Sequence, residues 1–196
     1  MSDAVAGGGP RLFLVRHGAT EWSDDGRHTG RTDVPLTERG RAQAAAVGQA
    51  LRGRRFALVL VSPLGRARET CRIAGYGHEA VEDPDLLEWD YGDYEGVTTA
   101  EIRTTVPGWT VWSGPIPDGE TVEEVAGRAD RVIARAGAAG GDVVLFAHGH
   151  VLRVLTARWC ELDPREGRRF PLETGTTCVL GREHEYRGVR LWNAPT

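Results

Sequence analysis

Two short apolar runs that each end in a histidine constrain this chain more than any other feature. Leu12–Val15 is followed directly by Arg16 and His17, and Val143–Ala147 is followed by His148; a glycine comes after each histidine. A short, unbroken apolar run is typical of a buried strand. Because parallel strands of an open sheet end at one edge, where such folds bind their ligands, we expect the two histidines to lie together.

Strand-like and helix-like segments alternate along the chain. The expected strands are 12–15, 58–61, one near 81, 143–147, 176–180 and 189–192, and the expected helices are 41–51, 63–73, 99–103, 121–136 and 151–159. This alternation predicts an α/β fold, a three-layer sandwich with a mostly parallel central sheet and helices on both faces. We expect residues 1–10 to form a flexible N-terminal tail and residues 11–196 to form a single domain.

Local signals predict where several helices start. Thr37 is typical of a helix N-cap, and Pro63 is expected in the first turn of the helix that ends near Ile73. The segment 121–124 matches a capping box. Between the first strand and Thr37, the polar segment 18–35 is expected to be a loop.

Composition and charge argue against several classes of protein. The chain has 24 basic and 28 acidic residues, a net charge of -4, and all of its basic residues besides histidine are arginine. A nearly balanced charge disfavours a general binder of nucleic acid or membrane surfaces. The sequence shows neither a secretory signal nor a run of the roughly 18 apolar residues that span a membrane. We expect a cytoplasmic protein, and a homodimer is compatible with the sequence.

The cysteines and histidines do not form a metal-binding pattern. Cys71, Cys160 and Cys178 are too scattered for a disulfide framework or a zinc knuckle, so we expect reduced thiols that are mostly buried. His148 and His150 are two residues apart, but no cysteine or carboxylate pattern completes a ligand set around them. We expect no metal and no cofactor.

The strand ends bring together side chains that suit a phosphate group. Arg16 and His17 follow the first strand, Arg66 lies near the start of a helix after the second, and His148 follows the fourth. Two arginines and two histidines at one point are costly unless an anion lies between them. Because guanidinium groups match phosphate oxygens and helix N-termini add N–H donors, these residues predict a phosphate pocket.

The same residues suit phosphoryl transfer. A neutral imidazole held in one tautomer by a backbone carbonyl can attack phosphorus and form a covalent phosphohistidine. A second histidine beside arginines can donate to the phosphoryl oxygens as charge shifts. The leaving oxygen needs a proton, and Glu88, in a loop with several aromatic residues, is a candidate acid.

The segment Leu14–Trp22 resembles the signature of the histidine phosphatase superfamily, in its phosphoglycerate mutase-like branch. The similarity continues in chain order at 29–43, 62–70, 88–96 and 147–149. Within the family, the segment 88–96 is most similar to that of broad-specificity acid phosphatases of actinobacteria and of sedoheptulose bisphosphatases. Ser23 departs from the family, which often has asparagine at that position.

The resemblance implies a role for each matching residue. Five residues would carry the reaction: His17 as the phosphorylated nucleophile, Arg16, Arg66 and His148 as phosphoryl-binding groups, and Glu88 as the proton donor. Five more are expected to contact the substrate: Ser23, Thr29, Gly30, Tyr91 and Gly149. The implied function is a metal-independent phosphatase that hydrolyses monoesters of small metabolites such as sugar phosphates.

Two other functions stay open. Mutases of this family carry a longer insertion after the acidic loop, whereas this chain has only the compact segment 105–119, which favours water as the acceptor. A cofactor-dependent phosphoglycerate mutase remains the first alternative, and a catalytically silent binder of phosphorylated ligands the second.

Several tryptophans, arginines and histidines lie outside these motifs. Trp109 and Trp112 fit either a packed helical face or a lid over the substrate. Arginines 27, 31 and 103 either bind a second phosphate or lie on the surface. The remaining histidines, His28, His78 and His184, are expected on the surface.

Overall fold

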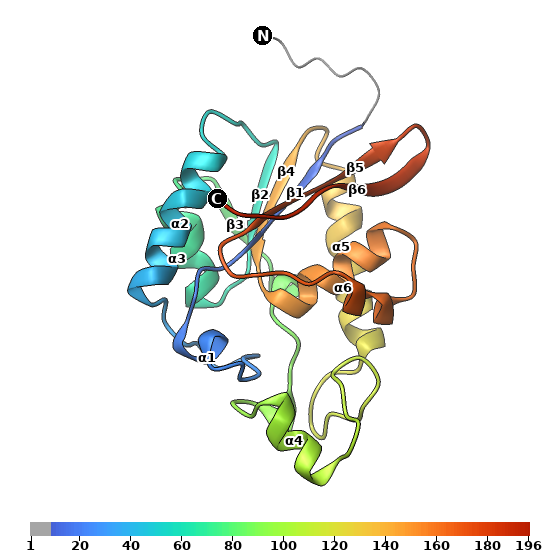
Figure 1. The fold of residues 1–196 in the computed structure, drawn as a ribbon. Helices are drawn as coiled ribbons and strands as arrows, with labels where there is room; N and C mark the ends of the chain where they lie inside the picture. Colours follow the sequence, from blue (N-terminus) through green and yellow to red (C-terminus); the bar gives the residue numbers. More distant parts are fainter. Residues whose placement is uncertain (1–8) are drawn as a thin grey trace.

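The computed structural model describes residues 9–196, which are built around one six-stranded sheet (Figure 1). The strand order is β3-β2-β4-β1-β5-β6. The pairs β3–β2, β2–β4 and β4–β1 are parallel, whereas β5 is antiparallel to both β1 and β6, so the sheet is mostly parallel as predicted. The strands are β1 (Leu12–Arg16), β2 (Leu58–Val61), β3 (Ala80–Glu82), β4 (Val143–Ala147), β5 (Thr177–Glu183) and β6 (Tyr186–Ala194).

Helices cover both faces of this sheet, which confirms the predicted α/β sandwich (Figure 1). Along β4, Val143 and Leu145 pack with α5 and α6, whereas Val144 and Phe146 pack with α2 and α3. Both faces of the strand are therefore apolar, and this explains its unbroken apolar sequence. The α-helices are α1 (Glu21–Asp24), α2 (Glu38–Ala50), α3 (Gly65–Ile73), α4 (Thr99–Thr105), α5 (Val122–Gly137) and α6 (Gly149–Trp159); 3-10 turns are η1 (Pro84–Leu86), η2 (Gly92–Tyr94) and η3 (Pro164–Arg169).

Some helix starts differ from the sequence prediction. The Thr37 side chain caps α2 by accepting from the Gly40 N–H, as predicted, but the helix begins at once with Glu38. The prediction for Pro63 is wrong, because Leu64 is the N-cap and α3 begins at Gly65. The Leu64 side chain cannot accept a hydrogen bond. The Gly65 N–H donates instead to the carboxylate of Asp33, which lies in the loop before α2.

The expected loop 18–35 contains one turn of helix. Thr20 and Ser23 form a capping box, in which each side chain accepts from the backbone N–H of the other residue. Two short polar side chains three residues apart were the signal for this turn. It sets α1 beside the carboxyl end of β1.

Gly18 lets the chain leave β1 in close contact with α2. A Cβ at Gly18 would overlap the backbone of Gly40, and a Cβ at Gly40 would overlap the backbone of Ala19. Gly18 is therefore needed for close backbone packing against α2, which the sequence analysis had not identified. This contact fixes the backbone directly after His17.

The expected N-terminal tail lies mostly outside the described residues, since residues 1–8 are not described. Cys71 and Cys178 are buried free thiols, as predicted, whereas Cys160 is half-buried and also free. Burial raises the pKa of the Cys71 thiol to about 12. Within residues 9–196, no helix has both the length and the apolar character needed to cross a membrane.

Candidate active site

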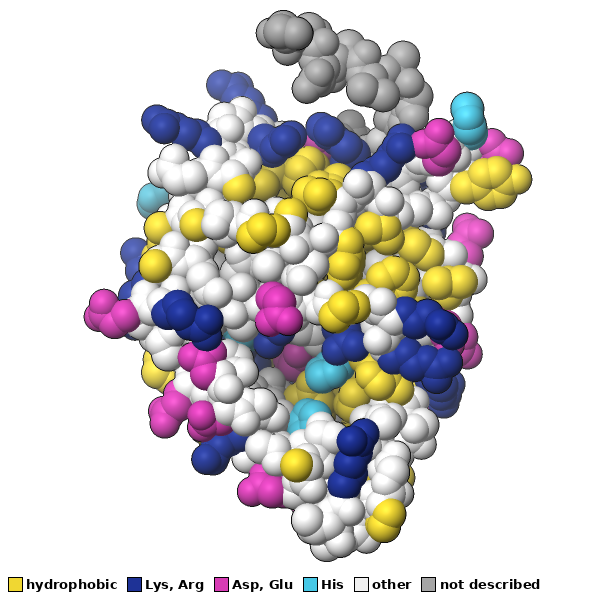
Figure 2. All heavy atoms as spheres, viewed as in Figure 1, with side chains coloured by type: hydrophobic (Ala, Val, Ile, Leu, Met, Phe, Trp, Pro, Cys, Tyr) yellow, Lys and Arg dark blue, Asp and Glu magenta, His cyan; other side chains and the backbone are white. Residues whose placement is uncertain are grey.

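A pocket of about 400 Å³ opens at the carboxyl ends of β1 and β4. Figure 2 shows it as a hollow that contains histidine side chains and has arginines around it. Its walls come from the ends of the two strands, from the α1 region, from the first turns of α6, and from the segment 98–121, which we name the cap. The cap includes α4 and extends beyond the sheet (Figure 1).

His17 lies at one end of this pocket with a defined tautomer. Its Nδ1 lies 2.7 Å from the carbonyl oxygen of Gly18, which can only accept, so Nδ1 carries the proton. Burial and the charges of Arg66 and Arg16 hold the pKa of His17 well below its usual range. The imidazole is therefore neutral, and its Nε2 has no hydrogen-bond partner among the described residues.

Arg16 supplies an unsatisfied donor beside His17. Its guanidinium donates from Nη1 to the carbonyl oxygen of Leu172, while its buried Nε has no partner within residues 9–196. A buried N–H without an acceptor costs free energy, about 1–3 kcal/mol or more for a charged group. Gly149 faces this guanidinium, since a Cβ there would lie 3.4 Å from the Arg16 Cζ atom. Arg16 thus presents a free N–H donor at the pocket, where the sequence analysis expects an anion.

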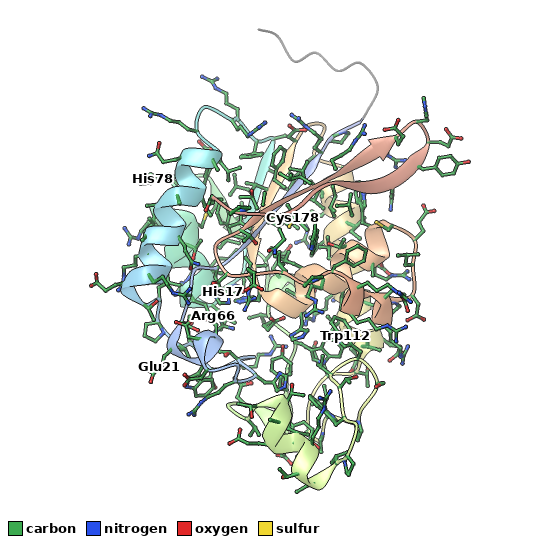
Figure 3. The ribbon with its side chains drawn as sticks, in the orientation of Figure 1. His17, Glu21, Arg66, His78, Trp112 and Cys178 are labelled. Atoms are coloured by element: carbon green, nitrogen blue, oxygen red, sulfur yellow. The ribbon has the colours of Figure 1, made fainter. Side chains whose placement is uncertain are left out.

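Arg66 and His148 lie directly behind His17. Figure 3 shows His17 and Arg66 close together at the end of the sheet. Arg66 Nε donates to His148 Nδ1 over 3.2 Å, so the proton of this imidazole is on Nε2, which lies 2.7 Å from Ser62 Oγ. The two imidazole rings have centroids 5.2 Å apart. Burial and the charge of Arg66 lower the pKa of His148 well below its usual range.

The donors of Arg66 are already occupied in this structure. Its guanidinium bonds the carbonyl oxygens of Thr29, Gly30 and Thr32 at 2.7–3.1 Å. Neither Arg66 nor His148 contributes to the pocket lining. Both residues therefore follow the strands after which they were expected, but their present contacts are with the protein itself.

Glu88 enters the pocket from the loop after β3. Its carboxylate accepts three backbone N–H bonds, from Trp89 at 3.0 Å and from His150 and Val151 at 2.9 Å each. Two of these donors belong to the first turn of α6, whose N-terminus favours a negative charge. The Cβ position of Gly149 is 3.6 Å from Oε2. Glu88 is thus fixed beside Arg16, and its position agrees with the sequence prediction.

The five predicted substrate contacts have different positions. Tyr91, Thr29, Ser23 and Gly149 line the pocket, but Gly30 does not. Gly30 instead donates its N–H to the Glu95 carboxylate at 2.8 Å, and a Cβ there would overlap Glu95 and the backbone of Trp89. Its role in the structure is therefore to allow close packing between two loops.

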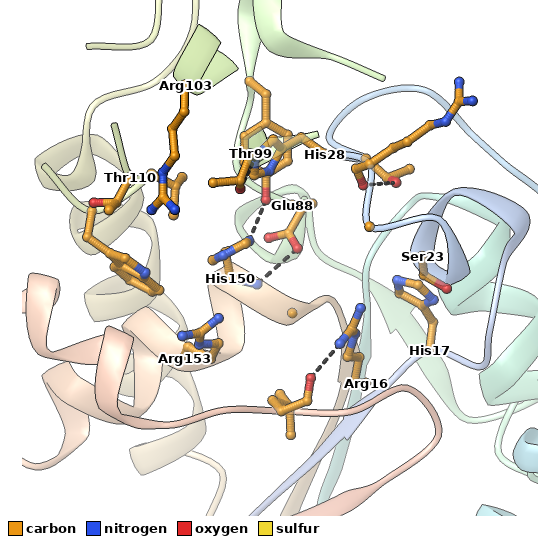
Figure 4. Close-up of a pocket in the computed structure, with 18 residues that line it drawn as sticks. Arg16, His17, Ser23, His28, Glu88, Thr99, Arg103, Thr110, His150 and Arg153 are labelled. Atoms are coloured by element: carbon orange, nitrogen blue, oxygen red, sulfur yellow. Dashed lines mark hydrogen bonds between the residues drawn. The ribbon is translucent and has the colours of Figure 1, made fainter. Parts of the chain in front are cut away.

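His150 was not predicted as a pocket residue. Its Nδ1 lies 2.6 Å from the hydroxyl of Tyr91, and its ring is near Trp112, with centroids 5.3 Å apart (Figure 4). Burial and Arg153 lower the pKa of His150 well below its usual range. The signal was available in the sequence, because a residue in the first turn of a helix that starts at a strand end points toward the same site.

His28 is buried rather than exposed, so the prediction for this residue is wrong. Its ring packs against Tyr91 and Trp109 with centroids 4.8 and 5.3 Å away, and Nε2 lies 3.2 Å from Thr99 Oγ1. Burial lowers its pKa to about 4. The cap covers His28, and no local pattern in the sequence indicated that contact. The other two histidines, His78 and His184, are exposed as predicted.

The two tryptophans of the cap have different positions, one in the core and one in the pocket wall. Trp109 is a core residue, 2% exposed, with Nε1 donating to the Pro115 carbonyl at 2.8 Å. Trp112 is 9% exposed and forms part of the pocket wall. The cap thus packs as core on one side and lines the pocket on the other. Arg153, which the sequence analysis did not consider, also lines the pocket.

Within residues 9–196, no group of three or more His, Cys, Asp or Glu side chains is arranged to hold a metal ion. The pocket instead offers a neutral imidazole, an unsatisfied guanidinium donor and one carboxylate. This combination can bind a phosphate group, attack it, and exchange a proton with it.

Comparisons with known proteins agree with this chemistry. The model of the histidine phosphatase superfamily (branch 1) matches residues 12–195. An acid phosphatase of Mycobacterium tuberculosis is 43% identical over 185 residues, which cover 92% of this chain and 91% of that protein. A sedoheptulose 1,7-bisphosphatase of Saccharomyces cerevisiae is 35% identical over 182 residues, covering 76% of this chain and 67% of that protein. These are the two kinds of member that the segment 88–96 resembled.

A solved structure supports the same assignment at the level of the fold. The product of an open reading frame of Mycobacterium tuberculosis has a TM-score of 0.90 and 40% sequence identity, over 95% of this chain and 98% of that one. Together with the family match over nearly all described residues, this confirms the resemblance inferred from the motifs. The chain belongs to the histidine phosphatase superfamily, branch 1.

Proposed function

We propose that this chain, a phosphatase by its family, hydrolyses small phosphate monoesters through a phosphohistidine at His17, with water as the acceptor and without a metal ion. One observation carries the proposal. Among residues 9–196, the neutral imidazole of His17 has Nδ1 bonded to the Gly18 carbonyl and Nε2 unpartnered, beside the buried and unsatisfied Nε of Arg16. Such an arrangement favours nucleophilic attack on a bound phosphate.

In the first step, Nε2 of His17 attacks phosphorus while the bond from phosphorus to the ester oxygen breaks. Arg16 neutralises charge on the phosphoryl oxygens, and its unsatisfied Nε gains an acceptor. Glu88 takes up a proton when the phosphate dianion binds beside it, and it gives that proton to the leaving oxygen, which departs as an alcohol. The products of this step are the alcohol and phosphohistidine.

In the second step, Glu88, now ionised, takes a proton from water while the water oxygen attacks phosphorus. The phosphorus–nitrogen bond breaks, releasing phosphate and returning neutral His17. Backbone N–H groups hold the Glu88 carboxylate in the same place throughout, which suits a group that acts first as an acid and then as a base.

Arg66 and His148 are proposed to complete the phosphoryl site. The His148 ring lies 5.2 Å from that of His17 and the charge of Arg66 acts on His17, but the donors of both residues now bond backbone carbonyls, Ser62 and, for Arg66 Nε, His148 itself. Binding of a phosphate dianion would have to replace some of these neutral acceptors with charged ones, and charge-assisted bonds are roughly twice as strong. His148 and Arg66 would then hold the phosphoryl group during transfer.

The test is hydrolysis of p-nitrophenyl phosphate in the presence and absence of EDTA. We expect turnover that the chelator leaves unchanged and that His17→Ala abolishes in a folded protein. Absence of turnover by the wild-type chain would contradict the hydrolase and leave the silent binder, and activity lost only with EDTA would contradict metal independence. The mutase alternative predicts isomerisation of 3-phosphoglycerate that is faster than release of phosphate from it.

A further inference from the structure

The pocket contains more positive charge than one phosphate group requires. Among its lining residues are four arginines, Arg16, Arg27, Arg103 and Arg153, and a single carboxylate, Glu88. Only Arg16 lies beside His17 and the carboxylate. At about 400 Å³ the cavity also has the size of a site for a whole small molecule, and a phosphate group fills only a small part of it.

Two of these arginines gather at the end of the pocket away from His17. Arg103 reaches down from α4 and Arg153 lies on α6, one turn after its start, and His150 lies between them and His17 (Figure 4). Trp112 closes this end, and the Arg153 guanidinium stacks over its ring at 4.7 Å from the centroid. We name the pair Arg103 and Arg153 the distal subsite.

Neither arginine of the distal subsite forms an ion pair in the described part of the chain, although the charge of Glu88 acts on Arg153. Arg103 donates from Nε to the Trp109 carbonyl at 2.8 Å, which leaves both Nη groups without a partner there. Arg153 donates from Nε and Nη2 to the carbonyls of Gly167 and Arg168, at 3.1 and 3.3 Å, which leaves Nη1. Burial lowers the pKa of Arg153, so its charge is held there at a cost.

Arginines elsewhere in the same region are paired, which makes the difference specific. Arg31 bonds the carboxylates of Asp90 and Glu120 at 3.3 and 3.4 Å, although its buried Nη1 has no partner within residues 9–196, and it does not line the pocket. Arg27 lies 3.5 Å from Asp25. Arg103 is exposed and Arg153 is half-buried, so the N–H groups left over at the distal subsite are open to an acceptor that the ligand brings.

We propose that the distal subsite binds a second anionic group of the substrate, so that the enzyme prefers small phosphomonoesters that carry a further phosphate or carboxylate. This inference rests on the proposed function, because His17 defines the reacting end of the ligand. The phosphoryl group to be cleaved lies at His17 and Arg16, the second anion lies between Arg103 and Arg153, and the carbon skeleton passes His150 and Trp112.

The test is titration calorimetry with a His17→Ala background, in which the ligand is bound but not consumed. Two ligand pairs differ only by the second anion: fructose 1,6-bisphosphate against fructose 6-phosphate, and 3-phosphoglycerate against glycerol 3-phosphate. We expect the first member of at least one pair to bind about 10-fold more tightly or better, as one charge-assisted hydrogen bond allows. The pair that shows the difference identifies the second anion as phosphate or carboxylate.

Arg103→Gln and Arg153→Gln are then added singly to the same background. Each substitution is expected to remove most of that difference in affinity. It should weaken binding of the ligand with two anions far more than binding of the ligand with one. Arg55→Gln is the matched control, because Arg55 is exposed in the loop before β2, at the opposite end of the sheet, and should leave the difference as it was.

Two results would overturn the distal subsite: equal affinity within both pairs, or a difference that survives both substitutions. Neither result depends on turnover, so failure of this inference is distinguishable from failure of the proposed function. The latter is measured separately as hydrolysis of p-nitrophenyl phosphate, which carries no second anion, by the chain with His17 intact.

Discussion

The Nδ1 atom of His17 donates to the carbonyl oxygen of Gly18 over 2.7 Å, and this bond selects the nitrogen that is free to react. Because both residues are adjacent in sequence, the bond depends on the local backbone conformation rather than on a distant partner. That conformation is in turn held by the contact between Gly18 and Gly40 of α2. The packing of one glycine against a helix thus determines the orientation of the proposed nucleophile.

Substitution of Gly18 by alanine tests this dependence. The new Cβ overlaps backbone atoms of Gly40, so the loop must shift, and we expect a loss of about 1–3 kcal/mol in the free energy of unfolding together with a large fall in kcat. Urea denaturation and p-nitrophenyl phosphate turnover measure the two effects. Gly137→Ala is the control, since no atom lies near that position in α5 and alanine favours the helix. Equal stability of the two variants would contradict the packing argument.

Glu88→Gln separates proton donation from substrate positioning. An amide cannot donate a proton to the leaving oxygen, so esters with poor leaving groups should be affected most. We expect kcat for glycerol 3-phosphate to fall by roughly 100-fold or more, the range of general acid catalysis, and kcat for p-nitrophenyl phosphate to fall much less. Steady-state kinetics on both substrates give the comparison. Equal slowing of the two would mean that Glu88 acts only by position.

Arg128 supports the segment that carries Glu88. It is 9% exposed, donates to the carbonyls of Asp85 and Leu87 at 2.7 and 2.9 Å, and pairs with Glu120 at 2.8 Å. Arg128→Met leaves Glu120 Oε1 and those carbonyls without their donor, while Glu120 Oε2 keeps the Asp90 N–H and Arg31, and we expect a loss of about 3 kcal/mol in the free energy of unfolding.

Arg131→Met is the matched control for Arg128, three residues further along α5. Arg131 pairs with Asp85 but is itself 60% exposed, so its loss should cost far less stability than the loss of Arg128. Denaturant unfolding of both variants provides the measurement. A cost for Arg128→Met as small as that for Arg131→Met would show that the buried network contributes little to the loop.

Burial of His28 predicts a loss of stability in acid. The folded chain keeps this residue neutral down to about pH 4, whereas the unfolded chain takes up the proton near pH 6.5. Below pH 6.5 the unfolded state therefore binds more protons, and the free energy of unfolding falls as the pH falls toward 4. For His28 alone the loss is about 3 kcal/mol between pH 7 and pH 4. The lowered pKa values of His17, His148 and His150 act in the same direction.

The contribution of His28 is measured by urea unfolding of His28→Asn at several pH values, each compared with the same variant at pH 7. The dependence on pH should be weaker than in the wild-type chain by about 3 kcal/mol across this range. His78→Asn, at an exposed position, should keep the wild-type dependence. An unchanged slope in His28→Asn would contradict the burial of a neutral imidazole.

The strand ends could be predicted from the sequence because they depend on local patterns. The apolar runs before His17 and His148 define buried strands, and parallel pairing of β1 with β4 brings their ends together. The polar residues that follow each strand then have to meet. Glu88 was a candidate acid from its aromatic-rich loop and matched the proton donor of the family by resemblance, but its three N–H donors come from Trp89 and α6, and no local pattern connects α6 with it.

The residues at the far end of the pocket could not be predicted from the sequence, because tertiary contacts bring them together. His28, Arg103 and Arg153 meet through the cap, whose path is set by irregular turns and by core packing of Trp109. Such contacts depend on tertiary structure and leave no periodic signal in the sequence. An exposed arginine and a pocket arginine therefore look the same until the fold is known.

The central claim is that His17 carries the phosphoryl group, and an alkaline quench tests it most directly. Wild-type protein is mixed with a 32P-labelled phosphomonoester and quenched in base during turnover, and the label on the protein is measured. We predict a phosphoenzyme that is stable in base and labile in acid, located on the peptide that contains His17, and absent from His17→Ala. Turnover of the ester without any label on that peptide would contradict the covalent mechanism.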